Sequence, residues 1–174
     1  QPYVLTTIHT PWKVKFEERR QGPKESVVFN TLTDWITSED PRIKYYSGTA
    51  DYTNTFTIKE IPSQPTYINL GKVVAMAKVY LNGKYVGGAW TYPYRLNITD
   101  YLQKGENTVK IEVVNNWVNR LIGDLKLPAE QRSTWTMVNP WRDDSQLQSS
   151  GLFGPVRIES HDYELLKFSP LSDN

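Results

Sequence analysis

Two stretches of the chain collect the side chains that proteins use to hold sugars. Aromatic faces pack against the C–H patches of a sugar ring, and planar polar groups bind its hydroxyls, so tryptophan or tyrosine beside arginine, asparagine or aspartate is the pattern to seek. The first stretch, the 90–95 cluster, contains Trp90, Tyr92, Tyr94 and Arg95. The second, the 117–142 cluster, contains Trp117, Asn119, Arg120, Asp124, Trp135, Trp141 and Arg142. Both are candidate carbohydrate-binding sites, and packing within the domain or against a neighbouring domain is the alternative role.

Groups suited to catalysis are poorly placed in the sequence. A glycosidase needs two carboxylates about 5 Å apart, or about 6.5–9.5 Å apart for the inverting reaction. The pair Asp143-Asp144 and the scattered Asp51 and Glu112 supply carboxylates, but adjacent aspartates in a polar loop are ordinarily solvated. His9 and His161 are the two imidazoles, and neither has an acid or a nucleophile at a recognisable spacing. The sequence therefore predicts no catalytic residue.

The composition argues against several classes of partner. With 20 basic and 19 acidic residues the net charge is +1, so the chain lacks the field that recruits nucleic acid. No apolar run approaches the ~20 residues of a membrane span, and the absence of cysteine excludes disulfides and thiolate-bound zinc. Six tryptophans and eleven tyrosines exceed the usual needs of a small core, so we expect some to face outward. Because the chain begins at Gln1 without a secretory signal, we expect a processed or excised piece.

Alternating apolar residues predict the strands that must position these clusters. From residue 50 onward Tyr52, Phe56 and Ile58 share one face, with threonines on the other. An apolar run over 73–81 leads into Asn82-Gly83, whose positive φ angles suit a type I′ hairpin turn before 84–87. Periodicity and turn signals predict further strands over 12–16, 27–29, 108–114 and 156–159. A turn is predicted over 105–107, directly before the strand 108–114.

Helical signals are scarce. Residues 32–38 and 100–103 each predict about one turn, the first capped by Thr31 or Thr33. The interval 115–150 lacks sustained alternation and is predicted to be a long functional or structural loop, in which Arg120 and Asp124 have the spacing to pair within a helical turn. We therefore predict one all-β domain over 1–174, with its core at about 12–160. The expected architecture is a two-sheet antiparallel β-sandwich with jelly-roll topology, an immunoglobulin-like sandwich being the alternative.

The order of several motifs resembles the sugar-binding, galactose-binding-domain-like β-sandwich of glycoside hydrolase family 2. The likeness is closer still to the related domain of family 106 α-L-rhamnosidase-like proteins, because the segment 116–124 is one that a plain sandwich does not need. It covers about 12–159 and rests on the segments 46–52 (YSGTADY), 79–87 (VYLNGKYVG), 93–102 (PYRLNITDYL), 104–107 (KGEN), 116–124 (NWVNRLIGD) and 150–156 (SGLFGPV).

This resemblance implies an accessory module beside a catalytic barrel that carries the reactive carboxylates. Its expected partners are a carbohydrate or the barrel of the same polypeptide, in a periplasmic or extracellular glycoside hydrolase. No cofactor is required; a structural calcium ion, common in related jelly rolls, is compatible with the chain but has no position in it, and metal ligands are unknown. Two other functions remain open: a purely structural domain–domain interaction module and, less favoured, a self-sufficient glycosidase.

Overall fold

The computed structural model of the chain describes residues 2–161 and contains two main antiparallel sheets. The larger sheet has six strands in the order β3-β2-β4-β10-β7-β8. Its long centre is the β4–β10 pair, in which residues 49–58 and 105–114 are aligned without interruption. The strand bounds are β2 Trp12–Phe16, β3 Val27–Phe29, β4 Thr49–Ile58, β7 Met76–Leu81, β8 Lys84–Ala89 and β10 Gly105–Val114.

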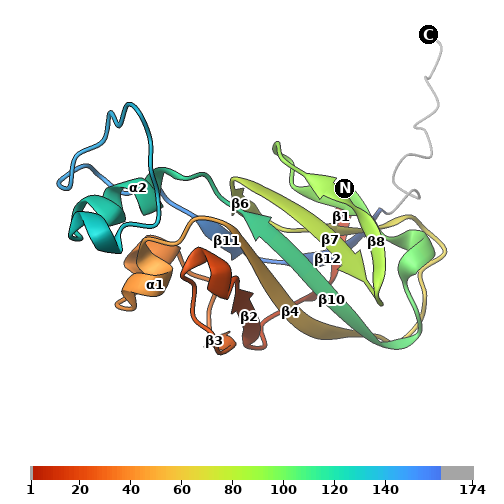
Figure 1. Ribbon diagram of the computed structural model, residues 1–174. Helices are drawn as coiled ribbons and strands as arrows, with labels where there is room; N and C mark the ends of the chain where they lie inside the picture. Colours follow the sequence, from red (N-terminus) through yellow and green to blue (C-terminus); the bar gives the residue numbers. More distant parts are fainter. Residues whose placement is uncertain (1, 162–174) are drawn as a thin grey trace, which may run out of the picture.

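The second sheet has four strands in the order β1-β12-β5-β9, and a two-stranded ribbon pairs β11 with β6. Strands from the two ends of the chain, β1 and β12, lie side by side (Figure 1). The strand bounds are β1 Pro2–Thr7, β5 Thr66–Asn69, β6 Lys72–Val74, β9 Arg95–Asn97, β11 Gly151–Gly154 and β12 Arg157–His161. The antiparallel β-sandwich predicted from the sequence is thus confirmed.

Buried side chains alternate along the strands as the sequence predicts. In β2, Trp12, Val14 and Phe16 are buried while the lysines between them are exposed. An aromatic group joins this strand to the neighbouring segments: Phe16 makes edge-to-face contacts with Trp35 and Tyr46, at centroid distances of 5.4 and 4.8 Å. Such contacts add stabilisation beyond the burial of apolar area.

One buried hydrogen bond fixes the orientation of this aromatic group. Trp35 Nε1 donates to the hydroxyl of Tyr52 at 2.6 Å, and both rings are almost wholly buried. Gly151 lies against the same indole, where a Cβ atom would come within 2.7 Å of Nε1. The segment that leads into β11 is therefore packed against Trp35 through a residue without a side chain.

Three sequence predictions need correction. The run 73–81 is two strands, because the chain leaves the β6–β11 ribbon after Val74 and enters the six-stranded sheet as β7 at Met76. Residues 105–107 form the start of β10, since they pair with β4. The single turn near residue 35 is the 3-10 segment Trp35–Thr37, and its cap is Asp34, whose Oδ1 accepts from the amide of Ile36 at 3.2 Å.

The Asn82-Gly83 hairpin is confirmed, with φ angles of 51° and 78° that match a turn between twisted strands. The predicted turn near residue 100 is the 3-10 segment Thr99–Tyr101. Three further short helical elements were not predicted: α1 Pro41–Lys44 and the 3-10 segments Glu18–Arg20 and Ala129–Gln131. The helix α2 Val118–Leu125 lies inside the interval predicted to be a loop. Figure 1 places α1 and α2 together at one end of the sandwich.

Replacing Tyr52 with phenylalanine should destabilise the domain by about 1–3 kcal/mol, because Trp35 Nε1–H would stay buried without its acceptor. Urea unfolding followed by tryptophan fluorescence measures this change. The matched control is Tyr85→Phe, which removes an exposed hydroxyl and should alter the free energy of unfolding by less than about 0.5 kcal/mol. Equal stability of the Tyr52→Phe variant and the unchanged protein would contradict this role.

Candidate functional site

Helix α2 carries the centre of the 117–142 cluster. Val118, Leu121, Ile122 and Leu125 have the spacing of one helical face, a signal in the sequence that our strand-based reading missed. Gly123 lets α2 approach the end of α1 closely, because a Cβ atom there would come within 2.7 Å of the Tyr45 side chain. The helix is thus held against the end of the sandwich on one side.

Asn119 ties α2 to the end of the long loop. Its side chain donates to the carbonyl of Gln148 at 2.7 Å and accepts from the amide of the same residue at 2.8 Å. Its Nδ2 also lies 3.3 Å from the hydroxyl of Ser150, whose amide donates to Asp34 Oδ1 at 2.9 Å. Asn119 is fully buried, so its amide connects elements and does not face a ligand.

Asp124 ties α2 to the middle of the same loop. Its Oδ2 accepts four hydrogen bonds, from the amides and the hydroxyls of Ser133 and Thr134, at 2.7 to 3.0 Å. A buried carboxylate is costly unless hydrogen bonds replace its water, and these four supply that replacement. The loop therefore has a fixed path on both sides of residues 135–147.

Arg120 is buried beside Asp124 and is incompletely bonded. Its Nη1 donates to Gln21 Oε1 at 3.0 Å and lies 3.7 Å from Asp124 Oδ1, which confirms the predicted pairing within one helical turn. Burial lowers the pKa of Arg120, and the charge of Asp124 opposes that shift. Its backbone amide donates to the hydroxyl of Ser47 at 3.1 Å, which adds a further contact between α2 and the sandwich.

The loop held by these contacts presents apolar side chains to the outside. Trp135, Met137 and Val138 are 84%, 86% and 78% exposed, and we call these three residues the loop surface. Beside them Trp117 is half exposed, with the guanidinium of Arg20 stacked on its ring at 4.6 Å. An open hollow of about 380 Å³ is lined by Trp117, Leu121, Ser133, Thr134, Trp135 and Thr136. Two tryptophans and three hydroxyl groups thus border one space.

The remaining predicted residues lie apart from this hollow. Trp141 is half-buried and Arg142 is exposed on the loop. In the 90–95 cluster, Trp90 and Tyr92 are exposed, whereas Tyr94 packs against the core. Within residues 2–161, no hydrogen bond or ion pair joins the two clusters.

Arg95 in the first cluster is engaged within the sheet. It lies 3.5 Å from the buried Glu159, and its guanidinium covers the ring of Tyr67 at 3.7 Å. Its Nη2 is also 2.7 Å from Nε2 of His161. These contacts give Arg95 a structural position between β9, β5 and β12.

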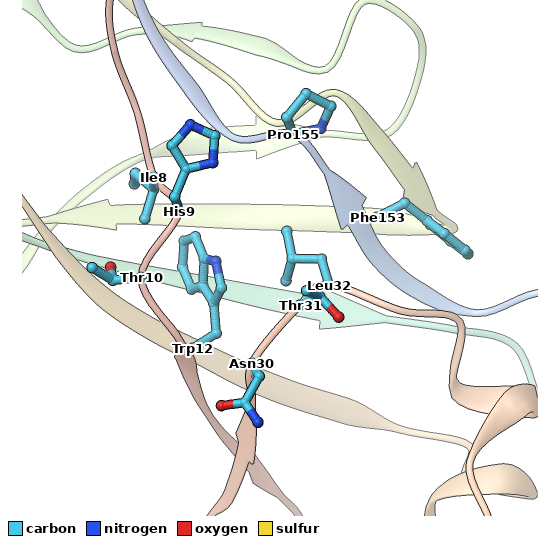
Figure 2. A pocket seen from close by; sticks show the side chains of 9 residues that line it. All are labelled: Ile8, His9, Thr10, Trp12, Asn30, Thr31, Leu32, Phe153 and Pro155. Carbon is cyan, nitrogen blue, oxygen red and sulfur yellow. The ribbon is translucent and has the colours of Figure 1, made fainter.

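A smaller hollow of about 220 Å³ lies between three chain segments, residues 8–12, 30–32 and 153–155. Figure 2 shows its nine lining side chains, including His9 and the indole of Trp12. None of the nine is a carboxylate, so His9 has no acidic partner there for general acid–base chemistry. The hollow does not assemble a catalytic pair.

A third hollow, of about 310 Å³, collects carboxylates on the outer face of the six-stranded sheet. It is lined by Lys15, Phe16, Glu17, Thr49, Asp51 and Glu112. The strand register places Asp51 directly opposite Glu112, which the sequence could not show. Burial raises the pKa of Asp51, repulsion from Glu112 and Glu17 adds to the shift, and Lys110 opposes it.

In the described range 2–161, no three or more histidine, aspartate or glutamate side chains are arranged to hold a metal ion. Nor does that range contain a helix with the length and apolar character needed to cross a membrane. The structural calcium ion that the family resemblance allows stays a prediction.

Comparison with known proteins shows similarity to glycosidases. The family described as "Glycosyl hydrolase 2 galactose-binding domain-like" matches residues 13–146. A putative β-glucuronidase of Formosa agariphila is 37% identical over 184 residues, which cover 91% of this chain and 16% of the relative. A β-galactosidase of Priestia megaterium is 31% identical over 157 residues, covering 83% of this chain and 13% of the relative. The chain thus spans about one sixth or less of these relatives.

Solved structures agree with this similarity. The rhamnosidase from Novosphingobium sp. PP1Y matches with a TM-score of 0.87 and 39% identity, over 92% of this chain and 15% of that chain. The β-D-glucuronidase of Dictyoglomus thermophilum matches with a TM-score of 0.62 and 20% identity, over 91% of this chain and 28% of that chain. The second likeness concerns the fold alone.

Replacing Asp124 with alanine should lower the free energy of unfolding by about 3–5 kcal/mol, because Arg120 would remain buried without its counter-charge. It should also speed hydrogen exchange at the amides of Ser133 and Thr134, which would lose their acceptor. Urea unfolding and amide exchange measure the two effects. Asp143→Ala, at an exposed aspartate of the same loop, is the control and should leave both unchanged. Slow exchange at both amides in the Asp124→Ala variant would disprove the anchoring role.

Asp51→Asn should stabilise the domain at pH 7 by about 0.2–1 kcal/mol, because it removes a carboxylate opposite Glu112. The pKa of Asp51 is raised in the folded state, so its ionisation lowers stability as pH rises above its ordinary range. At pH 3, where the carboxyl is protonated in both states, the advantage should vanish. Thermal unfolding across this pH range measures the difference in stability, with Glu106→Gln, at a carboxylate of β10 that lies opposite Thr57, as control. A pH-independent effect would contradict the prediction.

Proposed function

The chain belongs to the glycosyl hydrolase 2 galactose-binding domain-like family, and from this membership we propose that it is a non-catalytic accessory domain of a glycoside hydrolase. The proposal rests on the small share of each relative's length that this chain covers. The chain covers 16% of the similar putative β-glucuronidase and 15% of the similar rhamnosidase, so most of each relative, with room for a catalytic part, lies outside it. We place the parent protein in the periplasm or outside the cell, as the sequence resemblance implies.

The partner we propose for the domain is the catalytic part of the same polypeptide. The loop surface exposes three large apolar side chains on a loop that Asp124 and Asn119 hold in place. Large exposed apolar side chains grouped in one loop segment favour protein–protein contact, and the anchors at residues 133–134 and 148 reduce the conformational freedom that is lost on binding. The parent reaction we propose is hydrolysis of O-glycosyl bonds, in an enzyme of rhamnosidase-like or family 2-like type.

A second candidate, direct glycan binding, is favoured by the hollow between Trp117 and Trp135. Arg20 covers one face of the Trp117 ring, and the residue is half exposed, so part of the indole is available to a sugar ring. The hydroxyl of Thr134 donates to Asp124, and its oxygen keeps capacity to accept a hydrogen bond from a sugar hydroxyl. Titration with rhamnose- and galactose-containing oligosaccharides, followed by tryptophan fluorescence, tests this candidate. A flat response would leave docking as the function of this surface.

Replacing Trp135 and Met137 together with serine should weaken binding to the separately produced catalytic part at least tenfold, because buried aromatic and methionine anchors dominate interfaces. Isothermal titration calorimetry measures the affinity. The control is Val28→Ser, which removes an exposed apolar side chain from β3 and should leave the affinity unchanged. Unchanged affinity in the double variant would contradict docking through the loop surface. Because all three side chains are exposed, the variants are expected to fold.

A further inference from the structure

Arg120 has an empty carboxylate-binding edge. In a guanidinium group, the Nε–H and one Nη2–H bond point the same way and form the fork that grips a carboxylate with two hydrogen bonds. Both of these atoms of Arg120 are buried, and neither has a hydrogen-bond partner among the described residues. The contacts that Arg120 does make, with Gln21 and Asp124, use Nη1 on the other side of the group.

Two other arginines of the chain show how this edge is normally used. Arg42 holds Asp40 through Nε at 3.1 Å and Nη2 at 2.8 Å. Arg19 holds Glu17 through Nε at 3.1 Å and Nη2 at 2.6 Å. The side chains of Arg42 and Arg19 are 49% and 77% exposed, whereas that of Arg120 is 8% exposed. The fork is therefore empty in the arginine that has the least access to water, where an unmet donor costs most.

Arg120 borders a hollow of about 210 Å³ between α1 and α2. Its other polar or aromatic lining residues are Gln21, Arg42, Tyr45 and Lys126. The lining has three cationic side chains and no carboxylate, but Arg42 is already paired with Asp40 and Glu25 outside the lining. Asp124 does not fill the fork: its Oδ2 accepts four hydrogen bonds, and its Oδ1, which has no hydrogen-bond partner among the described residues, lies 3.7 Å from Nη1 and not beside the fork.

We propose that this hollow binds the carboxylate of a single uronic acid residue, with Arg120 as the buried anchor. The unused fork supplies two parallel donors, Lys126 adds positive charge at the rim, and the Tyr45 ring offers an aromatic face to the sugar. Because Nε and Nη2 are buried, ligand binding requires the Arg120 side chain to turn toward the hollow, which would release the contact of Nη1 with the exposed Gln21. The carboxylate follows from the geometry, whereas the choice of a sugar acid rests on the proposed function in a glycoside hydrolase.

Side-chain NMR of the whole 174-residue chain, labelled with ¹⁵N, reads the fork directly through the Nε–H signal of Arg120. Sodium glucuronate should shift this signal in a saturable way, and glucose at the same concentrations should leave it in place. Sodium acetate should shift it at concentrations at least tenfold higher, because it lacks the ring. An Nε–H signal that glucuronate does not move would overturn the proposal. Acetate binding as tight as glucuronate binding would overturn the assignment to a sugar acid.

Variants locate the binding further. Arg120→Lys keeps the charge but removes the paired donors, and it should weaken glucuronate binding at least tenfold. Arg132→Lys is the matched control on the exposed loop and should bind normally. Lys126→Gln at the rim should weaken binding several-fold, which tests the site even where Arg120→Lys fails to fold. Normal binding by Lys126→Gln and by a folded Arg120→Lys would refute the site.

This test is independent of the docking experiment. It uses the chain alone and residues between α1 and α2, whereas docking through Trp135 and Met137 requires the separate catalytic part. Failure of one result leaves the other standing.

Discussion

The carboxylate of Asp124 is buried, and a buried charge persists only where hydrogen bonds replace the water it has lost. Four donors from Ser133 and Thr134 make that replacement, so the loop must pass close to α2. Asn119, which precedes Asp124 on the same helix, fixes the position of Gln148 at the end of the loop in the same way. A segment with little regular secondary structure is thereby anchored at both ends, and the exposed Trp135 lies between the anchors.

The sandwich supplies the rigid base for this arrangement. Trp35, Tyr46 and Phe16 pack edge to face where the sheets end, and Trp35 bonds to Tyr52 within the core. Ser150 and Asp34 then connect that aromatic group to the start of β11. Because these contacts of the aromatic group are buried and closely packed, the end of the sandwich to which α2 is attached has little freedom to move. A domain of this kind can present side chains to a partner without reordering on contact.

The strands were predictable because their information is local. Alternation in β2, β4 and β10 and the Asn82-Gly83 turn each depend on a few neighbouring residues. The family resemblance, drawn from motifs in a fixed order, is confirmed by the match over 13–146. Prediction from local sequence was wrong where one apolar run contributes strands to two different sheets, with the break after Val74. It also missed α2, which lies among polar and aromatic residues.

The sequence by itself determined the all-β sandwich, its clearest hairpin and two clusters of chemically suitable residues, since propensity and periodicity are written in adjacent positions. Only the tertiary structure decided which cluster members face solvent. Asn119, Arg120 and Asp124 turn inward while Trp117 and Trp135 turn outward, because the inward residues find partners 9 to 99 positions away in the chain. Hydrogen-bond satisfaction of a buried polar group is a property of three-dimensional neighbours, which a linear pattern does not contain.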